Sequence, residues 1–246
     1  MENIYYQYHK GTAHPNICLV FLHEGLGSIK TWRNYPETLR KASGMSTMAY
    51  DRPGYGKSTG NLLNRPLNYL NLAAADLFNL LQKEKIDQVI LYGHSDGGSI
   101  ALDFAAKYPT MALALITEAA HVIVEDITLV GIRKAVKAYE ENKLKGLQKW
   151  HESDYTVIFE AWSKTWLNPA FKEWSLLKEL TLIKCPKLII QGTEDQYGTL
   201  KQVQLIENLT KGKTDLYIPK CGHTPFKEET TAVTDKVIAF LNDTIL

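Results

Sequence analysis

Short apolar runs alternate along the chain with longer segments in which apolar residues recur every three or four positions. Several runs are continuous, without polar residues at every second place, which is typical of strands covered on both faces of a sheet. These runs are 17–22, 89–92, 113–116 and 188–190. The segments 46–50 and 215–218 indicate further strands, and 3–9 indicates an edge strand that turns back at Lys10 and Gly11.

Helical periodicity fills the intervals between these strands. Apolar residues gather on one face in 69–84, 98–108 and 230–241, and Pro109 would end the second of these helices. Strands that alternate with helices predict an α/β fold with a mostly parallel central sheet and helices on both of its faces.

The stretch from 121 to 180 contains no run that indicates a central strand. Helical patterns dominate it, at 132–145 and 155–166, and it holds four of the five tryptophans: Trp150, Trp162, Trp166 and Trp174. We expect a small helical lid at 121–180, inserted into a core formed by 1–120 and 181–246. The tryptophans either pack this lid onto the core or shape a pocket, and we expect at least one of Trp150, Trp162 and Trp166 to face the cavity.

Composition limits the possible partners. The chain has 246 residues, enough for one large domain, and a formal net charge of +1 without long runs of one sign. That balance gives no electrostatic reason to expect nucleic acid or an anionic membrane. No apolar stretch reaches about 20 residues, and no signal peptide is visible. Three scattered cysteines argue against a disulfide framework, so we expect a cytoplasmic protein that acts on a small molecule.

The sequence G-H-S-D-G at 93–97 fits the pattern G-x-S-x-G, in which a serine is the nucleophile. It directly follows the apolar run 89–92 and directly precedes a helix, which is the strand–turn–helix setting that this motif needs. Glycines at both ends let so tight a turn close. We therefore predict that Ser95 is a catalytic nucleophile, the alternative being an ordinary glycine-rich turn.

A serine hydroxyl needs a base, and the base needs an orienting acid. His223 lies in a loop between a strand and the last helix, and Asp195 follows the run 188–190. Together with Ser95 they stand in the chain order serine, acid, histidine. We predict these three as a catalytic triad. Glu194 is the alternative acid, and His94 is the alternative base.

The oxyanion of such a reaction is stabilised by backbone N–H groups. The segment L-H-E-G-L-G-S at 22–28 follows a strand and can supply one donor, which we assign to Gly25 with Leu26 next. The residue after the nucleophile, Asp96, supplies the other. Glu24 and Leu26 would then border the substrate pocket. Such chemistry needs no metal and no organic cofactor.

Taken together, these residues resemble the α/β-hydrolase superfamily, in its lid-bearing branch of esterases, carbon–carbon bond hydrolases and proline iminopeptidases. The segment D-R-P-G-Y-G-K-S at 51–58 is similar to that branch's D-x-x-G-x-G-x-S loop, and 185–192 is similar to its strand before the acid. The resemblance covers nearly the whole chain and implies a serine hydrolase without a cofactor.

Two departures from the family pattern matter. Many relatives have His-Gly where this chain has His-Glu-Gly, so Glu24 adds a carboxylate that is either a pocket charge or a surface side chain. A serine rather than an aspartate at 95 disfavours haloalkane dehalogenase and epoxide hydrolase chemistry. The segments 95–98 and 105–109 are also similar to valacyclovir hydrolases, which implies that Asp96 binds a substrate ammonium group; otherwise Asp96 fixes the turn.

The sequence thus predicts a serine hydrolase whose default substrate is a small carboxylic ester. The alternatives are hydrolysis of a carbon–carbon bond in a vinylogous diketone, hydrolysis of an α-amino-acid ester, and a non-enzymatic small-molecule receptor of the same fold.

Overall fold

A single sheet organises the chain. The computed structural model describes residues 3–244, and within them the sheet has seven strands in the order β1-β3-β2-β4-β5-β6-β7. Only β1 is antiparallel to its neighbour. The strands are β1 Tyr6–His9, β2 His14–Leu22, β3 Met45–Tyr50, β4 Val89–His94, β5 Ala112–Glu118, β6 Lys187–Ile190 and β7 Thr214–Tyr217. The predicted α/β class is confirmed.

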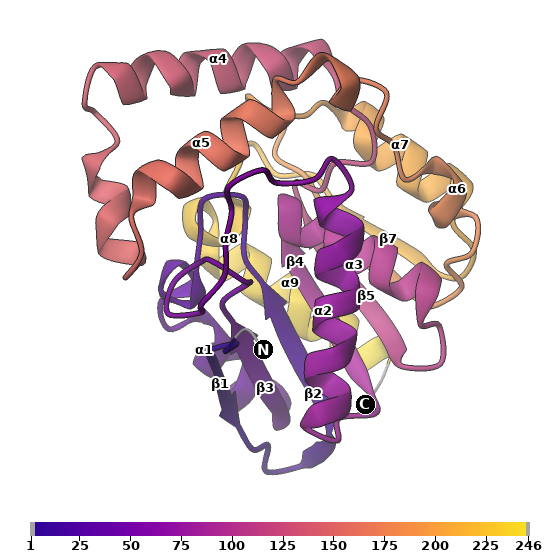
Figure 1. Cartoon of the computed structure of the whole chain (residues 1–246). Helices are drawn as coiled ribbons and strands as arrows, with labels where there is room; N and C mark the ends of the chain where they lie inside the picture. Colours follow the sequence, from indigo (N-terminus) through magenta and orange to yellow (C-terminus); the bar gives the residue numbers. More distant parts are fainter. Residues whose placement is uncertain (1–2, 245–246) are drawn as a thin grey trace.

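Helices cover both faces of this sheet (Figure 1). On one face, α2 (Tyr69–Lys83) and α3 (Asp96–Lys107) pack in one hydrophobic core, whereas α1 (Tyr35–Ser43) and α9 (Thr230–Thr244) pack in a second core on the other face. Along β2, Val20 belongs to the first core and Phe21 to the second. Alternate side chains thus enter different cores, which explains why the buried strands read as continuous apolar runs.

The parallel strands place their carboxyl ends along one edge of the sheet. β2 lies between β3 and β4, with Phe21 opposite Ala49 on one side and Tyr92 on the other. The loops that follow β2, β3 and β4 therefore leave the sheet side by side. This is the edge at which ligands bind in open α/β sheets.

Helices of the segment between β5 and β6 lie over that edge. They are α4 (Asp126–Glu140), a 3-10 helix at Lys145–Trp150, α5 (Tyr155–Trp166), a 3-10 helix at Pro169–Phe171, and α6 (Leu177–Leu180). Figure 1 shows α4 and α5 together at one end of the molecule. The helix expected at 132–145 is α4, which begins earlier, at Asp126, and ends earlier, at Glu140.

The two ends of this insertion meet. Ile123 and Ser175 form an isolated antiparallel bridge, and the Leu176 N–H donates to the Val122 carbonyl at 2.9 Å. The chain continues through α7 (Leu200–Leu209) and α8 (Pro225–Glu228). Within residues 3–244, the helices are either too short or too polar for a membrane span.

Candidate active site

Ser95 occupies a sharp turn between β4 and α3. Its backbone has φ 54° and ψ −120°, a conformation that a residue with a side chain adopts only at a cost. A Cβ atom on Gly93 would collide with the Gly97 carbonyl, and one on Gly97 would collide with the Leu22 carbonyl. Both glycines are therefore required for the turn to close, and the turn holds the Ser95 side chain at the sheet edge.

His223 brings the hydroxyl of Ser95 and the carboxylate of Asp195 into one line. The Ser95 hydroxyl donates to His223 Nε2 over 3.0 Å, and His223 Nδ1–H donates to the two Asp195 oxygens at 2.9 and 2.8 Å. Ser95 follows β4, Asp195 follows β6, and His223 follows β7. The parallel sheet thus assembles three residues that are far apart in the sequence.

The environment of Asp195 favours its charged form. Burial alone would raise the pKa of this carboxyl, but the hydrogen bond and the charge of His223, with the Tyr197 N–H, hold the pKa below its usual value. The Tyr197 N–H donates to Oδ1 at 2.8 Å, and the Gln191 amide donates to Oδ2 at 2.7 Å. An ionised, fixed carboxylate can orient the imidazole and stabilise its protonated form.

The alternative acid and base lie elsewhere. Glu194 is exposed and approaches the ammonium group of Lys220 at 3.9 Å. His94 donates through Nε2 to the His223 carbonyl at 2.8 Å, so this nitrogen cannot accept the Ser95 proton. His94 therefore holds the loop of the candidate base in place. Glu228 does so from the other side, since its carboxylate accepts the N–H groups of Gly222 and Thr224.

A cavity of about 220 Å³ opens above Ser95. Residues of the sheet edge and of the insertion share its wall, including Gly25, Asp96, Glu24, Leu26, Trp162 and Trp166 from the predicted set. Trp150 is not among the lining residues, which corrects the expectation for that side chain. Its indole lies 4.4 Å from the ammonium of Lys149, and its carbonyl accepts the Ser28 hydroxyl at 2.9 Å.

The cavity has several further lining residues that were not predicted to border it. They are His94, His121, Thr128, Ile132, Leu147, Tyr197 and Thr224. His121 lies shortly after the end of β5, at the same sheet edge, and that position could have marked it. Burial lowers the pKa of His121, and its Nε2–H donates to the Tyr197 carbonyl at 3.1 Å.

Both acidic side chains at the cavity have internal partners. Glu24 Oε2 accepts the Thr31 hydroxyl at 3.2 Å and lies 3.8 Å from His94 Nδ1. Burial would raise the pKa of Glu24, but His94 outweighs it and holds that pKa well below its usual value. Asp96 Oδ2 accepts the Tyr69 hydroxyl at 2.8 Å and lies 3.5 Å from the Arg52 guanidinium.

The described residues contain no group of three or more histidine, cysteine or acidic side chains arranged to hold a metal ion. A larger hollow of about 640 Å³ lies far from the strand carboxyl ends, beside β1 and residues 84–88, and Ser95 does not line it. The small cavity is therefore the candidate site.

Comparisons with known proteins agree with this fold. Residues 19–236 match the model of the alpha/beta hydrolase family. The chain is 23% identical to a 2-hydroxy-6-oxo-6-phenylhexa-2,4-dienoate hydrolase of Burkholderia cepacia, over 96% of this chain and 91% of that protein. It is 28% identical to the human serine hydrolase BPHL, over 72% of this chain and 63% of that protein.

Solved structures show the same architecture. MGS-M2, an alpha/beta hydrolase enzyme from a Medee basin deep-sea metagenome library, superimposes with a TM-score of 0.80 at 21% identity, over 100% of this chain and 96% of that one. The esterase EaEST of Exiguobacterium antarcticum gives a TM-score of 0.77 at 20% identity, over 97% and 95% of the two chains. At such identities the likeness is one of fold. The family match, which spans most of the sheet and the insertion, shows that this chain belongs to the alpha/beta hydrolase family.

Proposed function

We propose that this hydrolase is a serine enzyme that cleaves a small carboxylic ester through an acyl-enzyme. The observation that carries the proposal is the hydrogen-bonded line from Ser95 through His223 to Asp195, at the floor of a cavity of about 220 Å³. A strained serine, an accepting imidazole nitrogen and a buried carboxylate are the parts that nucleophilic acyl transfer requires.

In this mechanism, Ser95 Oγ attacks the carbonyl carbon while its proton passes to His223 Nε2. The N–H groups of Gly25 and Asp96 receive the negative charge that develops on the carbonyl oxygen. The protonated His223 then gives its proton to the leaving alkoxide as the ester bond breaks. Water attacks the acyl-enzyme with His223 again as base, and the acid product leaves with Ser95 restored.

The size and the charge of the cavity support a small, uncharged acyl group. Apolar walls from Ile132, Leu147 and Trp162 enclose about 220 Å³. Two carboxylates and, among the described lining residues, no lysine or arginine face this space. The described wall therefore offers a negatively charged substrate no lysine or arginine as a partner.

The insertion would serve as the lid of this site. Thr128 and Ile132 of α4, together with Trp162 and Trp166 of α5, contribute to the cavity wall. In this role the helices shield the site from bulk solvent while the hydrolytic water still reaches it, and they limit the length of the acyl group.

Replacement of Ser95 tests the proposal. The wild-type protein should hydrolyse 4-nitrophenyl acetate and react with a fluorophosphonate probe, whereas Ser95→Ala should fold normally, lose nearly all turnover and remain unlabelled. Ser99→Ala, one turn further along α3, is the matched control and should still be labelled. Labelling of Ser95→Ala, or a wild-type protein that binds esters without turnover, would contradict the proposal; the second result would favour a receptor.

A carbon–carbon bond hydrolase is the second candidate, because a relative aligned over 96% of this chain is a dienoate hydrolase. The same three residues could serve that reaction. A 6-oxo-dienoate carries a carboxylate, however, and the described cavity wall offers it no lysine or arginine. We expect a higher kcat/KM for 4-nitrophenyl acetate than for a 6-oxo-dienoate, and the opposite order would favour the second candidate.

A further inference from the structure

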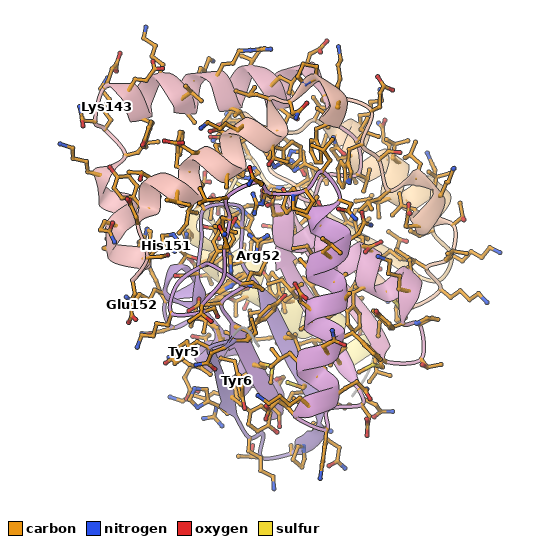
Figure 2. All side chains as sticks on the ribbon, viewed as in Figure 1. Tyr5, Tyr6, Arg52, Lys143, His151 and Glu152 are labelled. Atoms are coloured by element: carbon orange, nitrogen blue, oxygen red, sulfur yellow. The ribbon has the colours of Figure 1, made fainter. Side chains whose placement is uncertain are left out.

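A buried arginine lies directly behind the cavity. Arg52 follows β3 and is only 2% exposed. In Figure 2 it lies below α5, near the label of His151 of the insertion. A guanidinium in such a place is costly unless strong partners surround it, so its contacts indicate its role.

One guanidinium nitrogen of Arg52, Nη2, binds the loop that follows β2. Nη2–H donates to the Glu24 carbonyl at 2.7 Å. His23 Nε2 accepts the Arg52 backbone N–H at 3.2 Å, so the proton of that ring lies on Nδ1, which donates to the same Glu24 carbonyl at 2.8 Å. The Gly27 N–H reaches this carbonyl as well, at 3.2 Å.

The orientation of the Glu24 carbonyl also determines where the next N–H points. The Glu24 carbonyl and the Gly25 N–H belong to one planar trans peptide group, in which the two bonds point in opposite directions. When Arg52 and His23 hold the oxygen on the interior side, the Gly25 N–H is turned to the opposite side. Gly25 lines the cavity beside Ser95, so that side is the reaction space.

The second guanidinium nitrogen of Arg52, Nη1, approaches Asp96, whose backbone N–H is the other proposed oxyanion donor. Nη1–H lies 3.5 Å from Asp96 Oδ2, which also accepts the Tyr69 hydroxyl at 2.8 Å. The Tyr69 hydroxyl in turn accepts the indole N–H of Trp166, in α5, at 3.0 Å. One side-chain network therefore connects the β2 loop, the serine turn and the insertion.

We propose that Arg52 is the positioning residue of the oxyanion hole, which holds the Gly25 and Asp96 N–H donors at their spacing through the Glu24 carbonyl and the Asp96 carboxylate. The inference rests on the proposed function. The sheet order explains why Arg52 can do this, because β2 lies between β3 and β4 and the three loops meet. The Arg52 charge also offsets the Asp96 charge, which would otherwise oppose an oxyanion.

The test compares Arg52→Lys and Arg52→Met with Arg65→Met. Arg65 is the matched control, because it lies over the Tyr69 ring at 3.9 Å and donates to the Tyr55 hydroxyl, yet none of its contacts reaches residues 24–25 or 96. For each protein, kcat and KM are measured with 4-nitrophenyl acetate, inhibition with a trifluoromethyl ketone, and stability by thermal unfolding. The ketone forms a tetrahedral adduct with Ser95 whose oxyanion occupies the oxyanion hole, so its affinity falls when the donors of that hole are displaced.

We expect kcat to fall about 10- to 100-fold in both Arg52 variants, with KM within about twofold, because a donor displaced by a fraction of an ångström weakens only the transition state. Ketone affinity should fall in parallel with kcat, and Arg65→Met should retain both. Should Arg52→Met not fold, Arg52→Lys decides, since it keeps the charge and the alkyl chain.

Unchanged kcat in folded Arg52→Lys, or a loss of kcat without a loss of ketone affinity, would overturn the inference. A rise in KM alone would also overturn it, because that pattern indicates ground-state binding. Failure of the proposed function would look different, since Ser95→Ala would then remain active or the wild-type protein would not turn over the ester.

Discussion

At the scale of single residues, Asp96 has two candidate roles that its surroundings separate. Its carboxylate is 1% exposed and already has an internal cation, Arg52, and an internal donor, Tyr69. A substrate ammonium would have to compete with both partners. We therefore regard Asp96 as a residue that fixes the serine turn rather than as a receptor for an amino group.

This interpretation predicts that the wild-type protein hydrolyses free and N-acetylated amino-acid esters at similar rates. It also predicts that Asp96→Asn keeps the backbone donor but loses about 3–5 kcal/mol of unfolding free energy, because the buried guanidinium loses its counter-charge. Ester kinetics and urea denaturation measure the two effects. A strong preference for the free amine that disappears in Asp96→Asn would instead show that the carboxylate binds substrate.

Glu118, at the end of β5, is a second buried acid and has no direct part in the proposed reaction. It is completely buried and accepts the Tyr92 hydroxyl at 2.5 Å and the Phe226 N–H at 3.3 Å. Burial raises its pKa from an ordinary 4.5 to about 6, against the opposing effect of His94. The folded protein thus binds this proton more tightly than the unfolded chain does.

The stabilising contribution of protonated Glu118 is present below pH 4.5 and is lost as the pH rises to about 6. A shift of this size corresponds to about 2 kcal/mol. The unfolding free energy of the wild type relative to Glu118→Gln should therefore fall by about 2 kcal/mol between pH 4 and pH 7. Denaturation at several pH values measures this difference, and parallel curves for the two proteins would contradict it.

At the scale of elements, α4 is attached to the loop of the candidate acid by a close approach at Gly131. A Cβ atom there would lie 2.7 Å from the Gln196 carbonyl and 2.8 Å from the Tyr197 ring. The hydroxyl of Thr128, also on α4, donates to the Tyr197 carbonyl at 2.5 Å. Helix α4 therefore packs directly against the residue whose N–H supports Asp195.

Gly131→Ala should consequently destabilise the protein, although alanine favours a helix by about 1 kcal/mol over glycine. The clash is with a backbone carbonyl, and overpacking of this kind costs about 1–3 kcal/mol. We also expect kcat to fall, because Tyr197 would shift away from Asp195. Gly146→Ala is the control in the same insertion, where the added methyl group meets nothing within 4 Å. A higher melting temperature for Gly131→Ala would mean that helix propensity prevails.

The strands that could be predicted from the sequence are those buried on both faces of the sheet. β2 and β4 were recognisable because their successive side chains enter two cores. The edge strand expected at 3–9 is β1, which covers only Tyr6–His9. Its start was hard to predict because most of its side chains are exposed and leave no apolar pattern.

The residues proposed for catalysis were recognisable because each follows a strand. The positioning role that we propose for Arg52 was not recognisable, because its partners Glu24 and Asp96 lie 28 and 44 positions away and meet it only through the strand order. Trp150 was misplaced for a related reason. The apolar character of a side chain indicates that its surface is shielded from water. It does not indicate whether a cavity or a neighbouring lysine shields it.

At the scale of the whole molecule, the sheet and the insertion have different roles in the proposed reaction. The sheet positions Ser95, His223 and Asp195 through its strand ends, whereas α4 and α5 contribute much of the apolar cavity wall. Hydrogen bonds connect the two parts at several points. His151, for example, accepts the Gly56 N–H and donates to the Leu26 carbonyl, each at 3.0 Å.

The bridge between Ile123 and Ser175 joins the two ends of the insertion. The chain leaves the core and returns to it through one pair of hydrogen-bonded positions, so the segment between them can be exchanged without a change in strand order. A chimera that carries the corresponding segment of a related esterase between 123 and 175 should fold and should retain fluorophosphonate labelling at Ser95. Its preference among acetyl, butyryl and octanoyl esters should follow the donor of the graft. Replacement of this one segment during evolution would thus change the substrate preference of such an enzyme, while the residues at the strand ends stay the same.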